Sequence, residues 1–453
     1  METIHIYHTN DLHSHFNHWP RIHQFLLDRR TLHEEVDDEV FLFDIGDHMD
    51  RWHPYSDAFL GKGNVNLLNE AGYTAATIGN NEGITLSYEG LDEMYESANF
   101  DVLLANLYYK NGTRPNWAKP YKVYETCKGT RMAIIGLTAY FSRFYELLGW
   151  SMTDPIKELE SLLGSLEGQA DAIILLSHLG IHEDERIAEM FPEIDVILGG
   201  HTHHILHEGK QVEDTLLCGG GKHGQYVGHV TLTIDSLTKE IKQKKAILYD
   251  TNQLPSSENE LEYREMLFQL GKDQLGKVVT ELSISLDKRY IAAELCSALQ
   301  SWTKADASFL NEGLILGGLQ EGPLSKYDLL MICPHPINPC LVELTGAELK
   351  EVLLQTLDEK WEHLQVKGLG FRGTVMGKIV HHSISFEVQS GIKKVLVNGV
   401  ELKKEEKYKL AIPDMFTFGR FFPEIFRAKT KQYFLPEFMR DLLAWKLANG
   451  ESS

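Results

Sequence analysis

A short apolar run that stops at two glycines and is followed by two histidines sets narrow limits on this fold. Val196-Ile197-Leu198 leads directly into Gly199-Gly200-His201-Thr202-His203. Such a run is typical of a buried strand that ends in a tight turn. The two histidines then project from the carboxyl end of the strand, and imidazole is the commonest side-chain metal ligand. The segment therefore predicts a strand with a metal site at its end.

Four other segments have the same design, a β run that ends in polar residues able to bind a metal. They contribute Asp11 and His13 after residues 4–10, Asp47 after 40–46, Asn80 after 77–79, and His178 after 172–177. In open α/β sheets, sites form outside the carboxyl ends of the strands. We therefore expect these side chains to gather at one sheet edge together with His201 and His203.

The candidate ligands predict two metal ions. Seven ligands are more than a single tetrahedral ion needs, and a carboxylate such as Asp47 can bridge two ions. Nitrogen and oxygen ligands without thiolates suit Zn, Mn, Fe or Ni better than Ca or Mg. Two ions roughly 3.5–4 Å apart can clamp a phosphoryl group and generate a hydroxide nucleophile.

In their order along the chain, these motifs are similar to those of the calcineurin-like metallophosphoesterases. The opening, residues 9–16, resembles the bacterial branch that contains 5′-nucleotidases, UDP-sugar hydrolases and 2′,3′-cyclic phosphodiesterases. The set is specific, although each motif alone is weak. The resemblance implies two ligand groups that share Asp47. One comprises Asp11, His13, Asp47 and His203, and the other comprises Asp47, Asn80, His178 and His201.

The chain departs from that family at its catalytic dyad. Where relatives read Gly-Asn-His-Glu-Phe-Asp, this chain reads Gly79-Asn80-Asn81-Glu82-Gly83-Ile84. Asn81 replaces the histidine and Ile84 replaces the aspartate. An amide can hydrogen-bond a phosphoryl oxygen, the role we expect for Asn81 as a catalytic residue, but it cannot deliver a proton. General acid catalysis typically contributes 10²–10⁴-fold.

Three interpretations of this loss stay open. The enzyme is slow, it cleaves substrates with good leaving groups such as pyrophosphates or aryl esters, or another histidine has taken over. The histidines in or beside the motif loops are His15, His48, His53, His204 and His223. The loop after Asp47 is bulky and charged, unlike the family's, which affects the approach of the substrate.

The C-terminal half resembles the family's substrate-binding domain. Residues 344–349 match a Leu-Thr-Gly-x-Glu-Leu motif, and Asn311 opens a segment in which Leu316 replaces an arginine. The resemblance implies that Phe371 and Phe416 sandwich a nucleobase, a contact of roughly 1–3 kcal/mol for each ring. Packing in the core is the alternative for both rings, because aromatic side chains bury large areas.

Length and pattern predict two domains. At 453 residues the chain is too long for one core. We expect a metallophosphoesterase domain over 1–253, a linker helix over 254–276 and a 5′-nucleotidase-type domain over 277–453. Strands that alternate with helical patterns in the first half suit two sheets flanked by helices. With the resemblance, this is a four-layer α/β/β/α sandwich followed by an α+β domain.

Charge and cysteine content limit the partners and the location. A net charge of −21 argues against general nucleic-acid binding. No run approaches the roughly 18 apolar residues of a membrane helix. Met1-Glu2-Thr3 leads straight into a strand with no signal-peptide pattern. Five scattered cysteines are typical of reduced thiols. These features predict a cytoplasmic protein with no membrane and no protein partner.

Taken together, the sequence predicts a metal-dependent hydrolase of phosphoester or pyrophosphate bonds. A hydroxide that bridges two divalent ions would attack phosphorus in a small phosphorylated substrate, most simply a nucleotide or a nucleotide-like metabolite. Two alternatives are a catalytically weak nucleotide-binding protein on the same scaffold and a phosphatase of a non-nucleotide metabolite.

Overall fold

The chain folds into two compact units. The computed structural model describes residues 1–453 except 258, 390–391, 420 and 450–453. Unit 1 spans Met1–Gly271 and unit 2 spans Lys272–Ser453. The division falls inside helix α9, Glu260–Leu275, which is shorter at its start than the helix expected from the sequence.

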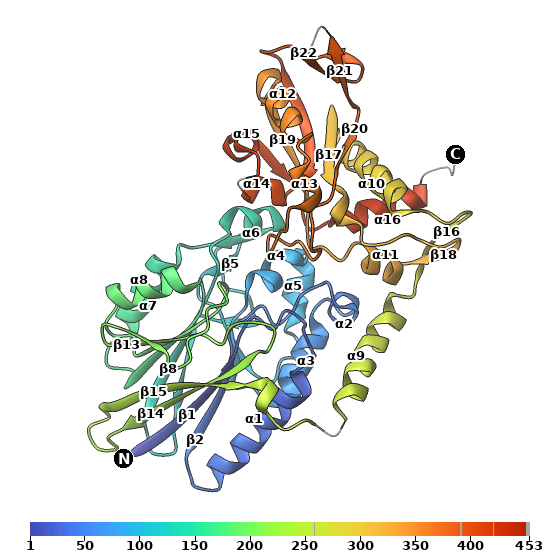
Figure 1. Ribbon diagram of the computed structural model, residues 1–453. Helices are drawn as coiled ribbons and strands as arrows, with labels where there is room; N and C mark the ends of the chain where they lie inside the picture. The colour runs from blue at the N-terminus through green and yellow to red at the C-terminus, as the bar shows by residue number, and fades with distance from the viewer. Residues whose placement is uncertain (258, 390–391, 420, 450–453) are drawn as a thin grey trace. The chain divides into compact units, whose positions relative to one another are not determined.

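Unit 1 is a sandwich of two sheets (Figure 1). The seven-stranded sheet has the order β15-β14-β1-β2-β3-β4-β6 and the six-stranded sheet has the order β12-β13-β11-β10-β8-β7. The first sheet comprises β15 Ile241–Asp250, β14 Tyr226–Ile234, β1 Glu2–Thr9, β2 Glu39–Asp44, β3 Ala75–Ala76, β4 Asp101–Leu103 and β6 Ala118–Lys119. The second comprises β12 Lys210–Val212, β13 Thr215–Cys218, β11 Val196–Gly199, β10 Ala172–His178, β8 Arg131–Thr138 and β7 Tyr121–Glu125.

The main core lies between the two sheets. Ile4 and Ile6 of β1 pack there with Ile174 of β10 and Val196 of β11. Because side chains alternate along a strand, His5 and Tyr7 of β1 face the opposite side of the sheet. This alternation decides which residues of β1 can meet the flanking helices.

Helices cover the outer faces of both sheets, so the expected four-layer sandwich is confirmed (Figure 1). Helix α7, Pro155–Leu166, begins where the Asp154 carboxylate accepts hydrogen bonds from two backbone N–H groups, and it buries Leu159 and Leu163 on the second sheet. The remaining helices of unit 1 are α1 Trp19–Glu34, α2 Pro54–Ala58, α3 Lys62–Ala71, α4 Asn80–Thr85, α5 Tyr88–Met94, α6 Ser142–Leu148 and α8 Ile181–Met190.

Unit 2 is built on a five-stranded sheet with the order β20-β17-β24-β19-β25. These strands are β20 Ile379–His382, β17 Ala307–Asn311, β24 Lys407–Pro413, β19 Pro339–Thr345 and β25 Lys431–Tyr433. Its helices include α10 Lys288–Thr303, α11 Lys326–Ile332, α12 Gly346–Gln355 and α16 Met439–Asn449. Helix α12 begins with a capping box in which Thr345 and Glu348 exchange hydrogen bonds, as its Leu-Thr-Gly-x-Glu-Leu motif favours. Unit 2 therefore has the expected α+β architecture.

In the described part of the chain, no helix combines the length and the apolar character that crossing a membrane would require.

Candidate metal centre

The loops after five strands meet at one edge of unit 1. The loop after β1 binds the loop after β2 through its backbone, since Asp11 N–H donates to Gly46 C=O at 3.0 Å and His13 N–H donates to Asp47 C=O at 2.8 Å. The second sheet joins them where the backbone N–H of His201 donates to the Asp11 carboxylate. Residues from both sheets therefore share one site, as the strand ends predicted.

The first group of ligand-type side chains comprises Asp11, His13 and His203. The Nε2 atoms of the two imidazoles lie 3.1 Å apart. Asp11 Oδ1 lies 3.6 Å from His13 Nε2 and 3.4 Å from His203 Nε2. Three ligand atoms thus converge within the spacing that one cation needs.

The second group comprises Asp11, Asp47 and His178. His178 Nε2 lies 3.4 Å from Asp47 Oδ2 and 4.0 Å from Asp11 Oδ1. Its Nδ1 donates to the carbonyl oxygen of Ile45 at 2.6 Å, which fixes the ring and turns Nε2 toward the two carboxylates. Among the described residues, this buried Nε2 has no hydrogen-bond partner.

The carboxylates of Asp11 and Asp47 lie near both groups. Asp11 belongs to each of them, and Asp47 Oδ2 is also 3.8 Å from His13 Nε2. The assignment of Asp47 as the bridging ligand stays a prediction, because Asp11 has equal access to both positions.

Asn80 and His201 lie at the edge of the second group. Their Oδ1 and Nδ1 atoms are 2.8 Å apart. Both atoms have lone pairs, so either a proton on Nδ1 or a cation can bridge them. The His201 ring lies 5.3 Å from that of His178. The structure thus brings all seven predicted ligands to one edge.

The donor set fits divalent cations. It offers carboxylate oxygens, an amide oxygen and imidazole nitrogens, most of them buried, and His178 Nε2 is a buried nitrogen that a cation would satisfy. These ligand types suit Zn, Mn, Fe or Ni.

The electrostatics of the centre show a surplus of negative charge. Burial opposes the charged form of His13, but hydrogen bonds to Asp11 and Asp50 outweigh burial and raise the pKa of His13 to about 10. Burial likewise opposes charge on His178, yet the Asp47 carboxylate raises its pKa to about 9. Without a metal, protonated His13 and His178 therefore balance the charge of the carboxylates, and a bound cation must displace the proton on each ligand nitrogen.

Several ligand residues have left-handed backbone conformations. The φ angles are 52° for Asp11, 50° for His13, 50° for Asp47, 69° for His201 and 58° for His203. Positive φ costs of order 1–3 kcal/mol for a residue other than glycine and clusters at functional sites. The fold holds these ligands in place at a cost to stability, which a bound cation would offset.

Asn81 lies against a candidate ligand. Its side-chain Nδ2 is 2.7 Å from His13 Nδ1, its backbone N–H donates to Asp47 Oδ1 at 2.7 Å, and only 6% of the residue is exposed. For Nε2 to be the ligand atom, Nδ1 must carry the proton, so the amide of Asn81 supports this ring when it turns its oxygen toward Nδ1–H. The predicted contact of Asn81 with a phosphoryl group stays a prediction.

Three supporting residues were not among the predicted site residues. Asp50 Oδ2 lies 3.5 Å from His13 Nδ1, and Asn10 donates to Asp11 Oδ2 at 2.8 Å. Glu82 accepts hydrogen bonds from the backbone N–H groups of Asp47, Met49 and Gly79. Burial, then the Asp47 charge, raises the pKa of Glu82 to about 7. In the sequence, each of these three residues is polar and lies next to a ligand motif, which is the signal that could have identified it.

Two of the five additional histidines lie beside the centre. The His223 ring is 5.8 Å from that of His13 and 3.7 Å from that of His15. Burial, then the charge of His15, lowers the pKa of His223 to about 3, so this ring is neutral near pH 7. His48 and His53 are buried, and His204 is exposed and contacts Thr202.

A cavity of about 800 Å³ adjoins this edge of unit 1. His15, Phe16 and Trp52 line one side, and residues of α9 line the other. The indole N–H of Trp52 donates to the carbonyl oxygen of His13 at 2.8 Å, which fixes the aromatic wall next to a candidate ligand.

The predicted substrate residues of unit 2 are all buried. Phe416 has no exposed surface and packs against Phe309 and Phe422. Phe371 is 4% exposed and stacks on His335 at 5.0 Å. Asn311 donates to Met376 C=O at 3.1 Å. These contacts favour a role in core packing for the three residues. Their binding of a nucleobase stays a prediction.

Comparison with known proteins agrees with the fold and with a metal-dependent site. Residues 4–204 match the model of calcineurin-like phosphoesterases, and residues 273–420 match that of the 5′-nucleotidase C-terminal domain. The chain belongs to the metallophosphoesterases of the 5′-nucleotidase family, which are hydrolases of phosphoester bonds.

Individual relatives cover nearly all of the chain. It is 43% identical to the uncharacterized metallophosphoesterase YunD of Bacillus subtilis over 99% of both chains. It is 25% identical to the snake venom 5′-nucleotidase of Gloydius brevicauda, over 84% of this chain and 73% of that protein. The structure of Haemophilus influenzae NAD nucleotidase has the same fold, with a TM-score of 0.65, 16% identity, and coverage of 98% of this chain and 96% of that chain.

Proposed function

We propose that this metallophosphoesterase uses two divalent cations to hydrolyse phosphoester or pyrophosphate bonds in nucleotides or nucleotide-like metabolites. The observation that carries the proposal is the convergence of the Asp11–His13–His203 and Asp11–Asp47–His178 groups, with His178 Nε2 buried and facing two carboxylates. When bound, the cations would supply an activated water and stabilise charge on the phosphoryl oxygens.

The residues of the chain would mainly position these groups. Asn81 and Asp50 hold the Nδ1 side of His13, Asn10 holds Asp11, and the Ile45 carbonyl holds His178. Such outer contacts orient ligands and tune their basicity. Asn81 would act as a positioning residue in this arrangement, rather than as a donor to the leaving group.

Loss of the dyad favours substrates with good leaving groups. A positioned acid typically contributes 10²–10⁴-fold, mostly where the leaving group is a basic alkoxide. Asn81 and Ile84 cannot supply a proton, and His223 is neutral near pH 7. A pyrophosphate or aryl ester needs less help, because its leaving group is already a weak base. The name of the structurally similar NAD nucleotidase is in accord with a dinucleotide substrate.

The cavity beside Trp52 provides a place for the nucleoside part of the substrate. Its volume of about 800 Å³ lies within the range of small-molecule sites. Trp52 and Phe16 offer aromatic surface there, whereas Phe371 and Phe416 are buried. If Trp52 stacks a base, Trp52→Ala raises KM for a nucleotide more than Phe371→Ala does, because stacking is worth roughly 1–3 kcal/mol.

A substrate panel tests the proposal. Chain loaded with Mn²⁺ or Zn²⁺ is assayed with nucleoside monophosphates, nucleotide sugars, dinucleotides, cyclic nucleotides and bis(p-nitrophenyl) phosphate. We expect kcat/KM to be highest for the pyrophosphate and aryl substrates. Preference for simple alkyl monoesters would contradict the leaving-group argument.

The second candidate function is a nucleotide-binding protein with no turnover. Replacement of the dyad by Asn81 and Ile84 favours it. Bound metal and nucleotide affinity without hydrolysis of any panel member would select this alternative. The expected cytoplasmic location and the absence of other partners stay predictions.

A further inference from the structure

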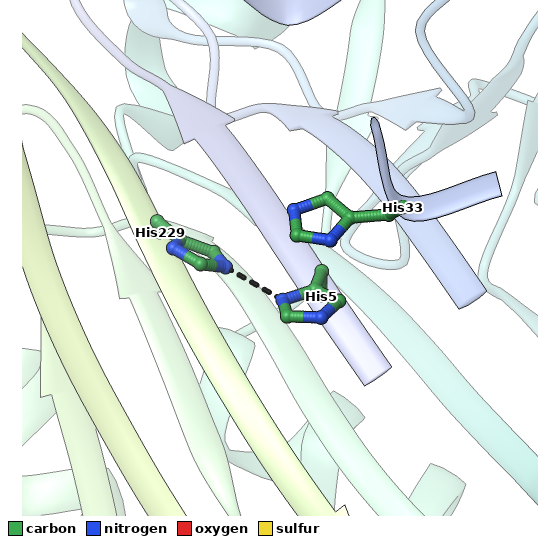
Figure 2. Close-up of side chains that lie close together, drawn as sticks. All are labelled: His5, His33 and His229. Carbon is green, nitrogen blue, oxygen red and sulfur yellow. Dashed lines mark hydrogen bonds between the residues drawn. The ribbon is translucent and has the colours of Figure 1, made fainter. Parts of the chain in front are cut away.

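Three histidines form a second cluster on the outer face of the seven-stranded sheet (Figure 2). His5 lies on β1, His229 on β14 and His33 in the last turn of α1. The cluster faces away from the core between the sheets, since Ile4 and Ile6 occupy that core. It shares no residue with the candidate metal centre.

The ring nitrogens converge. One nitrogen of each imidazole lies within 4.8 Å of one nitrogen on each of the other two. His5 Nδ1 and His229 Nε2 are 2.9 Å apart, as drawn in Figure 2. The His5 and His33 rings are stacked, with centroids 3.6 Å apart. Ligand nitrogens of a tetrahedral zinc ion lie roughly 3.3 Å from one another, given Zn–N bonds of about 2.0–2.1 Å.

Two of the imidazoles have partners on their far sides. Asp38 Oδ2 is 3.5 Å from His5 Nε2, the nitrogen that does not face His229. The Tyr7 hydroxyl is 2.8 Å from His33 Nε2. A carboxylate on the far nitrogen of a histidine is the usual outer partner of a zinc ligand, since it fixes the tautomer.

Only one of the two ring nitrogens of His229 has a hydrogen-bond partner among the described residues. Its ring stacks on Tyr7 with centroids 4.2 Å apart. Among the described residues, its buried Nδ1 has no hydrogen-bond partner. Imidazoles are costly where a sheet packs under a helix, a place usually filled by apolar side chains. A cation held by the facing nitrogens, His5 Nδ1 and His229 Nε2, would offset part of this cost, whereas His229 Nδ1 points away from the ion.

Burial favours the neutral form of all three rings. Burial lowers the pKa of His33 to about 4 and of His229 to about 3, and it also lowers that of His5. Neutral imidazole is the ligand form. The neighbouring imidazoles and then Arg29 lower the pKa of His33 and His229, and Asp38 raises the pKa of His5 and His33.

We propose that His5, His33 and His229 form a binding site for one divalent transition-metal ion, with Zn²⁺ the best match to three imidazoles. Asp38 would orient His5 through Nε2, and water would complete the tetrahedron. The His33 ring must turn out of its stack on His5 to direct its lone pair at the ion. The ion would tie the end of α1 to β1 and β14.

Zinc content per chain tests the site. The full chain is equilibrated with Zn²⁺ near pH 7.5, desalted and analysed by mass spectrometry of the metal. His33→Gln removes one ligand but keeps a polar partner for the Tyr7 hydroxyl. The matched control is His182→Gln on the exposed face of α8. We expect wild type and the control to hold one Zn²⁺ per chain more than His33→Gln.

Two further measurements separate this site from the other centre and from misfolding. The same comparison in an Asp47→Asn background must keep the difference of one ion, because that substitution acts at the other centre. Asp38→Asn, which retains all three imidazoles, should weaken the extra ion roughly 10–100-fold in chelator competition. Equal zinc content in wild type and His33→Gln, or unchanged affinity in Asp38→Asn, would overturn the proposal.

Discussion

At the scale of single residues, Asn81 stands where the family resemblance leads us to expect a catalytic histidine. The side chain contacts His13 Nδ1 at 2.7 Å and holds a candidate ligand. In this chain the position therefore lies where it can support the metal centre. The direction of this side chain depends on how α4 packs against the loop after β1, so the sequence could not predict it.

Substitution of Asn81 tests this role. Asn81→Ala removes the contact with His13, and we expect metal affinity to fall roughly 10–100-fold, the usual effect of losing an outer contact of a ligand. Competition with a metal chelator measures the change. Asn116→Ala, at an exposed asparagine of the same unit, is the control. Wild-type affinity in Asn81→Ala would show that the contact does not support the ligand.

The limits of prediction from sequence are clearest at particular residues. Strand ends and the glycines beside them placed Asp11, Asp47, His178 and His201 at one edge, because these signals are local. Whether an aromatic ring faces a pocket or the core is decided by distant segments. The sequence therefore allows Phe416 to face a pocket or to pack in the core. The structure buries it among other aromatic rings.

At the scale of elements, the N-terminus of α4 is fitted closely to the metal centre. Gly79 precedes this helix, and a Cβ atom there would collide with the Asp47 carboxylate. Glu82 in the first turn accepts hydrogen bonds from the backbone on both sides of this contact. The helix and the loop after β2 thus form one rigid support for Asp47.

A glycine-to-alanine pair tests this fit. Gly79→Ala should displace Asp47 and lower both metal content and kcat/KM by roughly 100-fold or more, about 2.7 kcal/mol of barrier. The matched control is Gly164→Ala inside α7, where a Cβ meets open space and alanine is favoured by up to about 1 kcal/mol. Full activity in Gly79→Ala would show that activity does not depend on the observed position of the Asp47 carboxylate.

The histidine cluster on β1, α1 and β14 depends on the pairing of strands that are far apart in the sequence. Alternation along β1 predicts that His5 and Tyr7 share a face. It does not reveal that His229, which is 224 residues away, will lie 2.9 Å from His5. That neighbour follows from the antiparallel pairing of β1 with β14.

At the scale of the whole molecule, the stability of the metal-free chain should decrease as the pH rises above neutral. The pKa values of His13 and His178 are raised to about 10 and about 9 in the folded chain, from an ordinary value of 6.5. Groups with raised pKa stabilise the fold fully below about pH 6.5, and this stabilisation is lost as pH rises through their folded values.

The melting temperature of chelated protein should therefore fall between about pH 7 and about pH 10. With divalent metal present, cations replace the protons, so the melting temperature should be higher and should change less over the same interval. Scanning calorimetry with and without chelator measures both curves. A chelated chain whose melting temperature rises with pH would contradict the charge balance described for the centre.

The account depends most on Asp11, Asp47 and their histidines binding the cations that drive hydrolysis. The most direct test is metal content and turnover of bis(p-nitrophenyl) phosphate, measured on the same preparations of wild type and Asp47→Asn. We predict metal-dependent turnover in wild type and a loss of roughly 100-fold or more in Asp47→Asn. Equal turnover in the two proteins, or turnover that persists after chelation, would contradict the account.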